Sequence, residues 1–157
     1  MMHKRFLPLL SLALATLAGH AAAQSSPGLS PHSSPIGVWA THSDKTGEVQ
    51  AHVVISERKG HLVGRIVQVL DPAAKPGELC VKCQDDRKNK PMASLEIIRD
   101  VQVKAGDGDW DGGRILDPQE GREYRLKLIP SADGQSLGVR GYLGPFYRTQ
   151  HWSRVQP

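Results

Sequence analysis

The sequence predicts an all-β fold, an eight-stranded antiparallel up-and-down barrel. From about residue 36 onward, short runs rich in β-branched and aromatic residues alternate with turn signals, and no segment has a long helical period. Sequential strands usually pair as neighbours, so eight strands in series can close into a barrel that leaves no sheet edge exposed. A two-sheet sandwich fits the same spacing and remains the alternative. The interior of an eight-stranded barrel is either filled with side chains or holds one small ligand.

The first three strands follow from apolar alternation and two turn signals. A β-rich run at Gly37–Thr41 precedes a turn at Asp44–Gly47. Apolar and polar residues then alternate over Val49–Ile55, the period of a half-buried strand, and Lys59-Gly60 forms the next turn. The third run, Leu62–Leu70, is apolar on both faces. It predicts that something other than the main core covers one face of this strand.

A charged segment of 23 residues, Asp71–Ala93, then interrupts the strand rhythm. Loops of this length in compact domains are often functional lids or binding loops. On a barrel, such a loop could cover the open mouth.

Five further runs complete the predicted set of eight strands. They are Leu95–Val103, Trp110–Leu116, Tyr124–Leu128, Leu137–Leu143 and Tyr147–Val155. Turn signals separate them, among them Asp117-Pro118 and the hairpin signal Asp133-Gly134. The Gly112-Gly113 pair inside the second of these runs predicts a β-bulge or a close approach of two backbones.

The N-terminal segment, residues 1–23, has the layout of a secretory signal peptide. Lys4 and Arg5 form a basic start, Phe6–Ala18 is an apolar stretch of 13 residues, and Ala21–Ala23 supplies the small residues of a cleavage site. We therefore expect the protein to be periplasmic or secreted. No apolar run reaches the roughly 20 residues of a membrane-spanning helix, so no transmembrane segment is predicted.

After cleavage, a disordered leader would precede the barrel domain. Residues 24–35 are rich in serine and proline and have almost nothing to bury, whereas residues 36–155 carry the strand pattern. Without Lys4 and Arg5, the 20 basic residues fall to 18 against 16 acidic ones, a net charge of +2. This weak charge excludes a strong electrostatic attraction to nucleic acid.

Five sequence motifs occur in order along the predicted barrel. They are Gly37-Val38-Trp39, Gly64-Arg65-Ile66, Ile115–Pro118 with Gly121 and Tyr124, Val139–Gly144, and Gln150–Arg154. Together they resemble the exported bacterial family catalogued as domain of unknown function 2147, over about Ile36 to Val155. The resemblance implies a lipocalin-like barrel, a periplasmic or secreted location and no established activity. It brings no catalytic residues.

The opening Gly37-x-Trp39 also resembles the start of a lipocalin. In lipocalins this tryptophan lies at the closed end of the barrel and packs against a basic residue of the last strand, which here matches Arg154. The resemblance implies a structural clasp of Gly37, Trp39 and Arg154, in which a guanidinium over an indole face contributes roughly 0.5–2 kcal/mol. The alternative is that Trp39 is an ordinary core aromatic and Arg154 an unrelated surface charge.

Cys80 and Cys83, in the long loop, leave three interpretations open. In an exported protein they would form a structural disulfide that pins the loop, with a chain-entropy contribution of about 2 kcal/mol. The same spacing occurs in redox enzymes, although there it lies at the start of a helix in a βαβ unit. A metal site would need further ligands, and none lies nearby in the sequence. Gln84 stands where a c-type haem site needs histidine, so we expect no cofactor.

Several basic and aromatic residues are candidates for contact with a ligand. They are Arg65, Arg125, Arg140, Tyr124 and Tyr142. The three arginines, with Arg148, lie on different strands and would favour an anionic ligand if they converged inside the barrel. Facing outward, they would be solubilising charges, which is the commoner case because unpaired charges are rarely buried.

Three hypotheses for the function remain. The first is a non-enzymatic barrel that binds a small, partly apolar or amphipathic molecule. The second is an envelope protein-interaction module with a filled barrel, whose outer apolar stripe could also pair two copies in a homodimer. The third is a thiol redox protein that uses Cys80 and Cys83. The serines lack the setting of a nucleophile elbow and the histidines are scattered, so nothing else in the sequence points to an enzyme.

Overall fold

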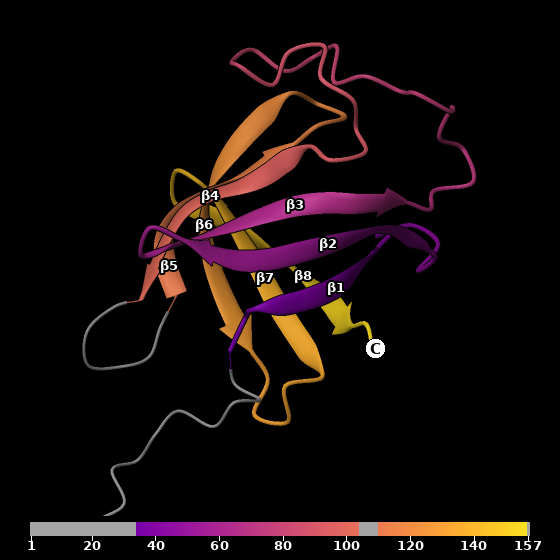
Figure 1. Cartoon of the computed structure of the whole chain (residues 1–157). Helices are drawn as coiled ribbons and strands as arrows, with labels where there is room; N and C mark the ends of the chain where they lie inside the picture. The colour runs from indigo at the N-terminus through magenta and orange to yellow at the C-terminus, as the bar shows by residue number, and fades with distance from the viewer. Residues whose placement is uncertain (1–33, 104–109, 157) are drawn as a thin grey trace, which may run out of the picture.

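The computed structural model describes residues 34–103 and 110–156 (Figure 1). The predicted signal peptide and all but the last two residues of the predicted leader lie outside the described residues. Within the described ranges, no helix is long and apolar enough to cross a membrane.

Eight β-strands form one closed antiparallel barrel, which confirms the predicted fold class and excludes the sandwich. They are β1 (Gly37–His42), β2 (Val49–Arg58), β3 (His61–Val69), β4 (Glu96–Val103), β5 (Trp110–Asp117), β6 (Arg122–Pro130), β7 (Ser136–Leu143) and β8 (Phe146–Arg154). Each strand pairs with its neighbours in the sequence. The ring closes between β1 and β8, where Trp39 pairs with Arg154 and Ala40 pairs with Ser153.

The barrel has two ends that differ in their connections. At the first, which we call the clasp end, β1 begins and β8 ends. At the second, the loop end, lie the short turns β1–β2, β5–β6 and β7–β8 together with the long β3–β4 connection over residues 70–95. Figure 1 shows this connection extending well beyond the strands, away from the described start of the chain.

Strand alternation decides which side chains enter the barrel. Leu126 and Leu128 of β6 are fully buried in the core and pair with Gly141 and Val139 of β7, so these four residues face inward. A continuous apolar core fills the barrel from the clasp end to its middle. Its inward side chains are Trp39, Val53, Ile55, Leu62, Ile98, Val101, Leu126, Leu128, Leu137, Val139 and Trp152.

The glycine pair of β5 marks both a bulge and a close approach of backbones. The β5–β6 register shifts between Asp111 and Gly113. A Cβ atom on Gly113 would lie 2.5 Å from the carbonyl oxygen of Arg99 and 2.8 Å from the amide nitrogen of Val101, distances that real Cβ atoms essentially never show. The absence of a side chain therefore lets β4 and β5 pair at this point, as the Gly112-Gly113 pair predicts.

The disulfide-bearing part of the long connection packs against the outer wall of β5 and β6. Leu116 and Glu123 pair with each other and alternate with the inward Ile115 and Tyr124, so they face outward. Leu116 is nevertheless buried, because Cys80 and Cys83 belong to the same buried cluster. This part of the connection braces the side of the barrel, so the idea that it covers the mouth is wrong for these residues.

The outer face of β3 is covered over only half of its length. Val63 is buried, whereas Val67, further along the strand toward the loop end, is half exposed. The prediction of a cover over this apolar face is therefore right at Val63 and wrong at Val67.

Candidate functional site

The inward side chains of the barrel become progressively more exposed toward the loop end. In the clasp half, Trp39, Val53 and Ile55 are almost completely buried. Toward the loop end, inward residues of six strands are only partly buried. They are Ala51, Val69, Ile115, Tyr124, Gly141 and Gln150, and we call the space that they surround the cup. Partial exposure of side chains that face the barrel axis means that solvent enters this half of the barrel.

The wall of the cup is mostly apolar and has one bare position. Gly141 has no side chain, and a Cβ atom there would lie 3.3 Å from Cβ of Tyr124 and 3.9 Å from Cγ2 of Ile115. The opposite wall carries the small side chain of Ala51, which pairs with Val69. Tyr124 and Ile115 pack close to the bare position of Gly141, so a larger side chain there would press on both and narrow the cup.

Polar groups lie at the rim of the cup. Arg148 pairs with Gly141 in the sheet, so it has the inward register, and its guanidinium makes an ion pair with Asp44 of the β1–β2 turn. The side-chain amide of Gln150 donates a hydrogen bond of 2.8 Å to the same carboxylate. The hydroxyl of Tyr124 lies 3.4 Å from a carboxylate oxygen of Glu120. The cup therefore combines an apolar wall with a polar rim that includes one exposed guanidinium.

Of the predicted ligand-facing residues, only Tyr124 faces the interior. Arg125 alternates with the inward Leu126, and its guanidinium lies 4.6 Å from the ring centre of Tyr142 on the outer wall. Arg140 alternates with the inward Val139 and stacks on Tyr147 at 4.5 Å.

Arg65 is also on the outer wall. Its guanidinium makes an ion pair of 3.1 Å with Glu96, which also binds Arg58 and Arg99. The arginines named from the sequence therefore do not converge inside the barrel. The sequence analysis does not include Gly141 and Gln150 among the ligand-facing residues. Both could have been predicted, because each lies two residues from an apolar strand position that faces inward, Val139 or Trp152.

Trp39 and Arg154 form a clasp that closes one end of the barrel. The guanidinium carbon of Arg154 lies 4.2 Å from the centre of the Trp39 ring, and its nitrogens donate to the backbone carbonyls of Ser34, Ile36 and Gly134. The indole nitrogen of Trp39 donates to the carbonyl of Pro35 at 2.8 Å. A side chain on Gly37 would collide with the guanidinium. These are the contacts that a structural clasp of the three residues requires, and they join the start of β1 to the end of β8.

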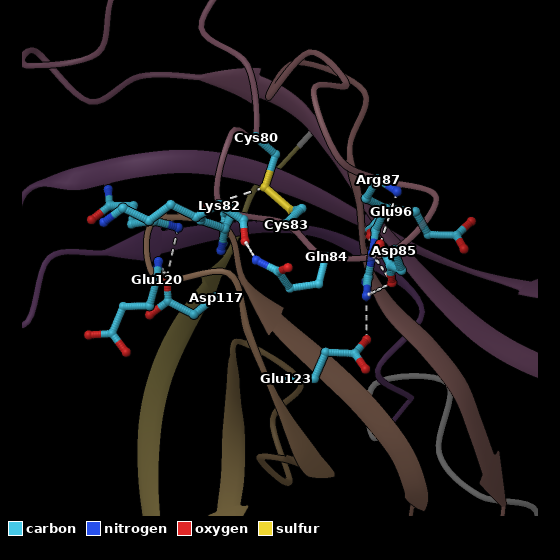
Figure 2. The surroundings of a disulfide bond; sticks show 12 residues. Cys80, Lys82, Cys83, Gln84, Asp85, Arg87, Glu96, Asp117, Glu120 and Glu123 are labelled. Atoms are coloured by element: carbon cyan, nitrogen blue, oxygen red, sulfur yellow. Dashed lines mark hydrogen bonds and ion pairs between the residues drawn. A yellow bond between two sulfur atoms is a disulfide. The ribbon is translucent and has the colours of Figure 1, made fainter.

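The sulfur atoms of Cys80 and Cys83 lie at disulfide-bonding distance, 1.90 Å (Figure 2). Both residues are fully buried, and Sγ of Cys80 lies 3.5 Å from the carbonyl oxygen of Pro118 in the β5–β6 turn. Lys82 packs so closely on Gly121 that any side chain at that glycine would collide with the Lys82 carbonyl. Because thiol exchange needs access to a sulfur atom, this burial favours the structural role over the redox role.

A buried arginine fixes the next part of the same connection. Arg87 is only 3% exposed and is held by the carboxylates of Asp85 and Glu123 and by the carbonyl of Glu96, as Figure 2 shows. The hydrogen bond from Arg87 lowers the pKa of Asp85 to about 2, although partial burial of the carboxyl acts to raise it. Sequence reasoning treated this charged run as part of a loop, because the sequence does not show which of its charges is buried.

We expect replacement of both Cys80 and Cys83 by alanine to lower the free energy of unfolding by about 2 kcal/mol, since the closed ring is short. Urea denaturation of oxidised wild type and variant measures this difference. The disulfide of the folded protein should also resist dithiothreitol far longer than that of the urea-unfolded chain. Equal reduction rates in the two states would instead favour the redox role.

Comparisons of the sequence and of the structure relate this chain to known proteins. A family model described as an uncharacterized protein conserved in bacteria, DUF2147, matches residues 37–154, which is the whole barrel. The chain belongs to this family. No curated protein sequence matches it.

Among solved structures, this DUF2147 protein is similar to the protein HP1028 of Helicobacter pylori, described as belonging to the lipocalin family. The two share 16% sequence identity with a TM-score of 0.64, over 77% of this chain and 82% of that one. At this identity the likeness establishes the fold, and the protein is a lipocalin-like barrel. Among the described residues, no three histidine, cysteine, aspartate or glutamate side chains come together as metal ligands would.

Proposed function

We propose that this protein is an exported, non-enzymatic binding protein that holds a small, partly apolar molecule in the cup. One observation carries the proposal: the inward residues of the loop half are only partly buried above a filled clasp half. The clasp half supplies an apolar floor through Leu126 and Trp152. Because only part of the barrel is open, the ligand must be small.

The distribution of polar groups suggests the chemistry of the ligand. The wall formed by Ala51, Val69 and Ile115 would contact an apolar body. Arg148 and Gln150 at the rim would contact a polar or anionic end, and the ion pair of Arg148 with Asp44 would open to admit it. An amphipathic molecule that enters with its apolar end first satisfies both parts of the cup.

The expected location rests on two features of the sequence. The N-terminal segment has the layout of a signal peptide, and a disulfide persists in the oxidising conditions outside the cytoplasm. Fractionation of cells that express the full chain tests this part, with the mature protein expected in the periplasm or the medium. Retention in the cytoplasm at full length would contradict it.

Gly141→Val tests the cup because its added side chain would press on Tyr124 and Ile115 and narrow the cup. The matched control is Gly138→Val, since Gly138 lies on the same strand with the outward register and its Cβ would have an equally close neighbour, 3.3 Å from Ile129. The probe is 1-anilinonaphthalene-8-sulfonate, which has an aromatic body and an anionic end. We expect Gly141→Val to weaken its binding roughly tenfold, which corresponds to about 1.4 kcal/mol.

Fluorescence titration of the folded proteins measures this binding, and urea denaturation shows whether both variants remain folded. The control should bind the probe like wild type. Equal binding by wild type and Gly141→Val, or no binding by wild type, would contradict the proposal.

A further inference from the structure

Exposed apolar side chains concentrate toward the loop end. Among the described residues, eight large apolar side chains are exposed, and six of them lie in the half of the barrel nearer that end. Those six are Val67, Leu79, Val81, Leu143, Phe146 and Tyr147. The remaining two, Ile36 and Ile129, lie near the clasp end. Only Leu143, Phe146 and Tyr147 lie together, on the β7–β8 hairpin, whereas Val67 lies on the far side of the ring and Leu79 and Val81 lie in the β3–β4 connection. Exposed apolar residues that gather in this way mark an interaction surface.

The β7–β8 hairpin carries the most exposed members of this set. Leu143, Phe146 and Tyr147 are 54%, 76% and 61% exposed, and only Gly144 and Pro145 separate Leu143 from Phe146. Leu143 and Phe146 pair directly across the hairpin. We call Leu143–Tyr147 the hairpin tip. It is a two-residue turn between two strand ends, so its exposed apolar surface is small and suits insertion into a lipid bilayer better than packing against a flat protein face.

Cations flank the hairpin tip. Arg125 stacks on Tyr142, directly before the tip, and Arg140 stacks on Tyr147 within it. A cation that stacks on an aromatic ring keeps its charge while its stem covers apolar surface, so these side chains can lie at the boundary between water and lipid headgroups.

We propose that the loop end of the barrel docks on an anionic lipid bilayer through the hairpin tip. Leu143 and Phe146 would enter the acyl region, Tyr147 would lie at the headgroup level, and Arg125 and Arg140 would bind lipid phosphates. Aromatic residues combined with arginine are typical of segments that lie in the membrane interface. A protein expected to be exported meets such a surface, and the docking does not depend on whether the cup holds a ligand.

Co-sedimentation with vesicles tests the docking. We expect the wild-type barrel to bind vesicles of phosphatidylethanolamine and phosphatidylglycerol and to bind pure phosphatidylcholine vesicles more weakly. The triple variant Leu143→Ser, Phe146→Ser, Tyr147→Ser should lose at least roughly tenfold in partitioning, since it removes most of the apolar area available for burial. The control is Ile129→Ser, because Ile129 is also an exposed apolar residue but lies near the clasp end, which the docking leaves in water.

A variant with fewer charges separates the electrostatic contribution to vesicle binding from the contribution of apolar insertion. Arg125→Gln with Arg140→Gln should remove most of the preference for anionic over zwitterionic vesicles and leave the apolar insertion in place. Absence of vesicle binding by the wild type would overturn the proposal. So would equal binding by the triple serine variant, or a wild-type dimer that the serine changes dissociate without any vesicle binding, since the tip would then pair two copies of the chain.

These outcomes are distinct from those of the ligand proposal. The triple serine variant leaves the wall of the cup intact, so its binding of 1-anilinonaphthalene-8-sulfonate in the absence of vesicles should equal that of the wild type. Gly141→Val, in turn, should dock on anionic vesicles normally. Failure of one proposal would therefore leave the other standing.

Discussion

Replacing Trp39 with alanine should lower the free energy of unfolding by about 3–5 kcal/mol, the largest effect that we expect from any single core change. The side chain is completely buried and packs in the core. It also supports the guanidinium of Arg154 and donates to the carbonyl of Pro35. Because domains of this size are stable by only about 5–15 kcal/mol, this loss removes a large part of the total stability, and urea denaturation measures it.

Arg154→Met isolates the clasp from the core. It keeps the length of the side chain but removes the cation over the indole ring and the donors to three backbone carbonyls. We expect a loss of about 2–3 kcal/mol from the unpaired carbonyls and the lost stacking. Urea denaturation measures the loss, and hydrogen exchange should show it first in the amides that join β1 to β8.

Arg140→Met is the matched control for this experiment. Arg140 also stacks on an aromatic ring, at 4.5 Å from Tyr147, but it does so on the exposed outer wall. Its removal should cost less than about 1 kcal/mol. Equal losses in the two variants would contradict the role that we assign to the clasp.

Replacing Arg87 with methionine should loosen the long connection and cost about 2–3 kcal/mol. The guanidinium is buried between Asp85 and Glu123, and both carboxylates would lose their partner. The cost is less than for a fully buried ion pair because both carboxylates keep access to solvent. Arg114→Met is the control, since Arg114 also pairs with Glu123 but is 69% exposed, and its loss should cost less than about 1 kcal/mol.

The pH dependence gives an independent test of the same contact. A carboxyl whose pKa is lowered on folding stabilises the folded state fully above its ordinary value, and this contribution disappears as the pH falls through the lowered value. For Asp85 that interval runs from 3.8 down to about 2. The wild type should therefore lose protection of the Cys80–Lys90 amides over this interval. In Arg87→Met, the same amides should be less protected above pH 3.8, and their protection should change less between pH 3.8 and about 2. Parallel profiles would contradict the assignment.

The strands could be predicted because their side chains alternate in a period that only an extended chain satisfies. Leu126 and Leu128 alternate with Arg125 and Lys127 along β6. The two leucines face the inside of the barrel, and the two charged side chains therefore face outward. The outward position of Arg125 was therefore available from its neighbours. The orientation of Arg65 is harder to predict from its neighbours, because the register between β3 and β4 shifts twice around Gly64.

The long connection could not be placed from the sequence because tertiary contacts decide its position. Arg87 is flanked by five other polar or charged residues over Asp85–Lys90, and nothing local distinguishes the one that is buried. Its partner Glu123 lies 36 residues further along the chain. The buried disulfide has the same explanation, since Leu116 and Pro118, which cover it, belong to β5 and its turn.

Native mass spectrometry of the protein purified from cells that express the full chain tests the cup most directly. We expect part of the wild-type population to carry an additional mass that is released on denaturation. Gly141→Val should carry less of it, and Gly138→Val should match the wild type. A wild-type protein that is bare in this measurement and also fails to bind 1-anilinonaphthalene-8-sulfonate would contradict the account, because a solvent-accessible cup with an apolar wall would then have no occupant.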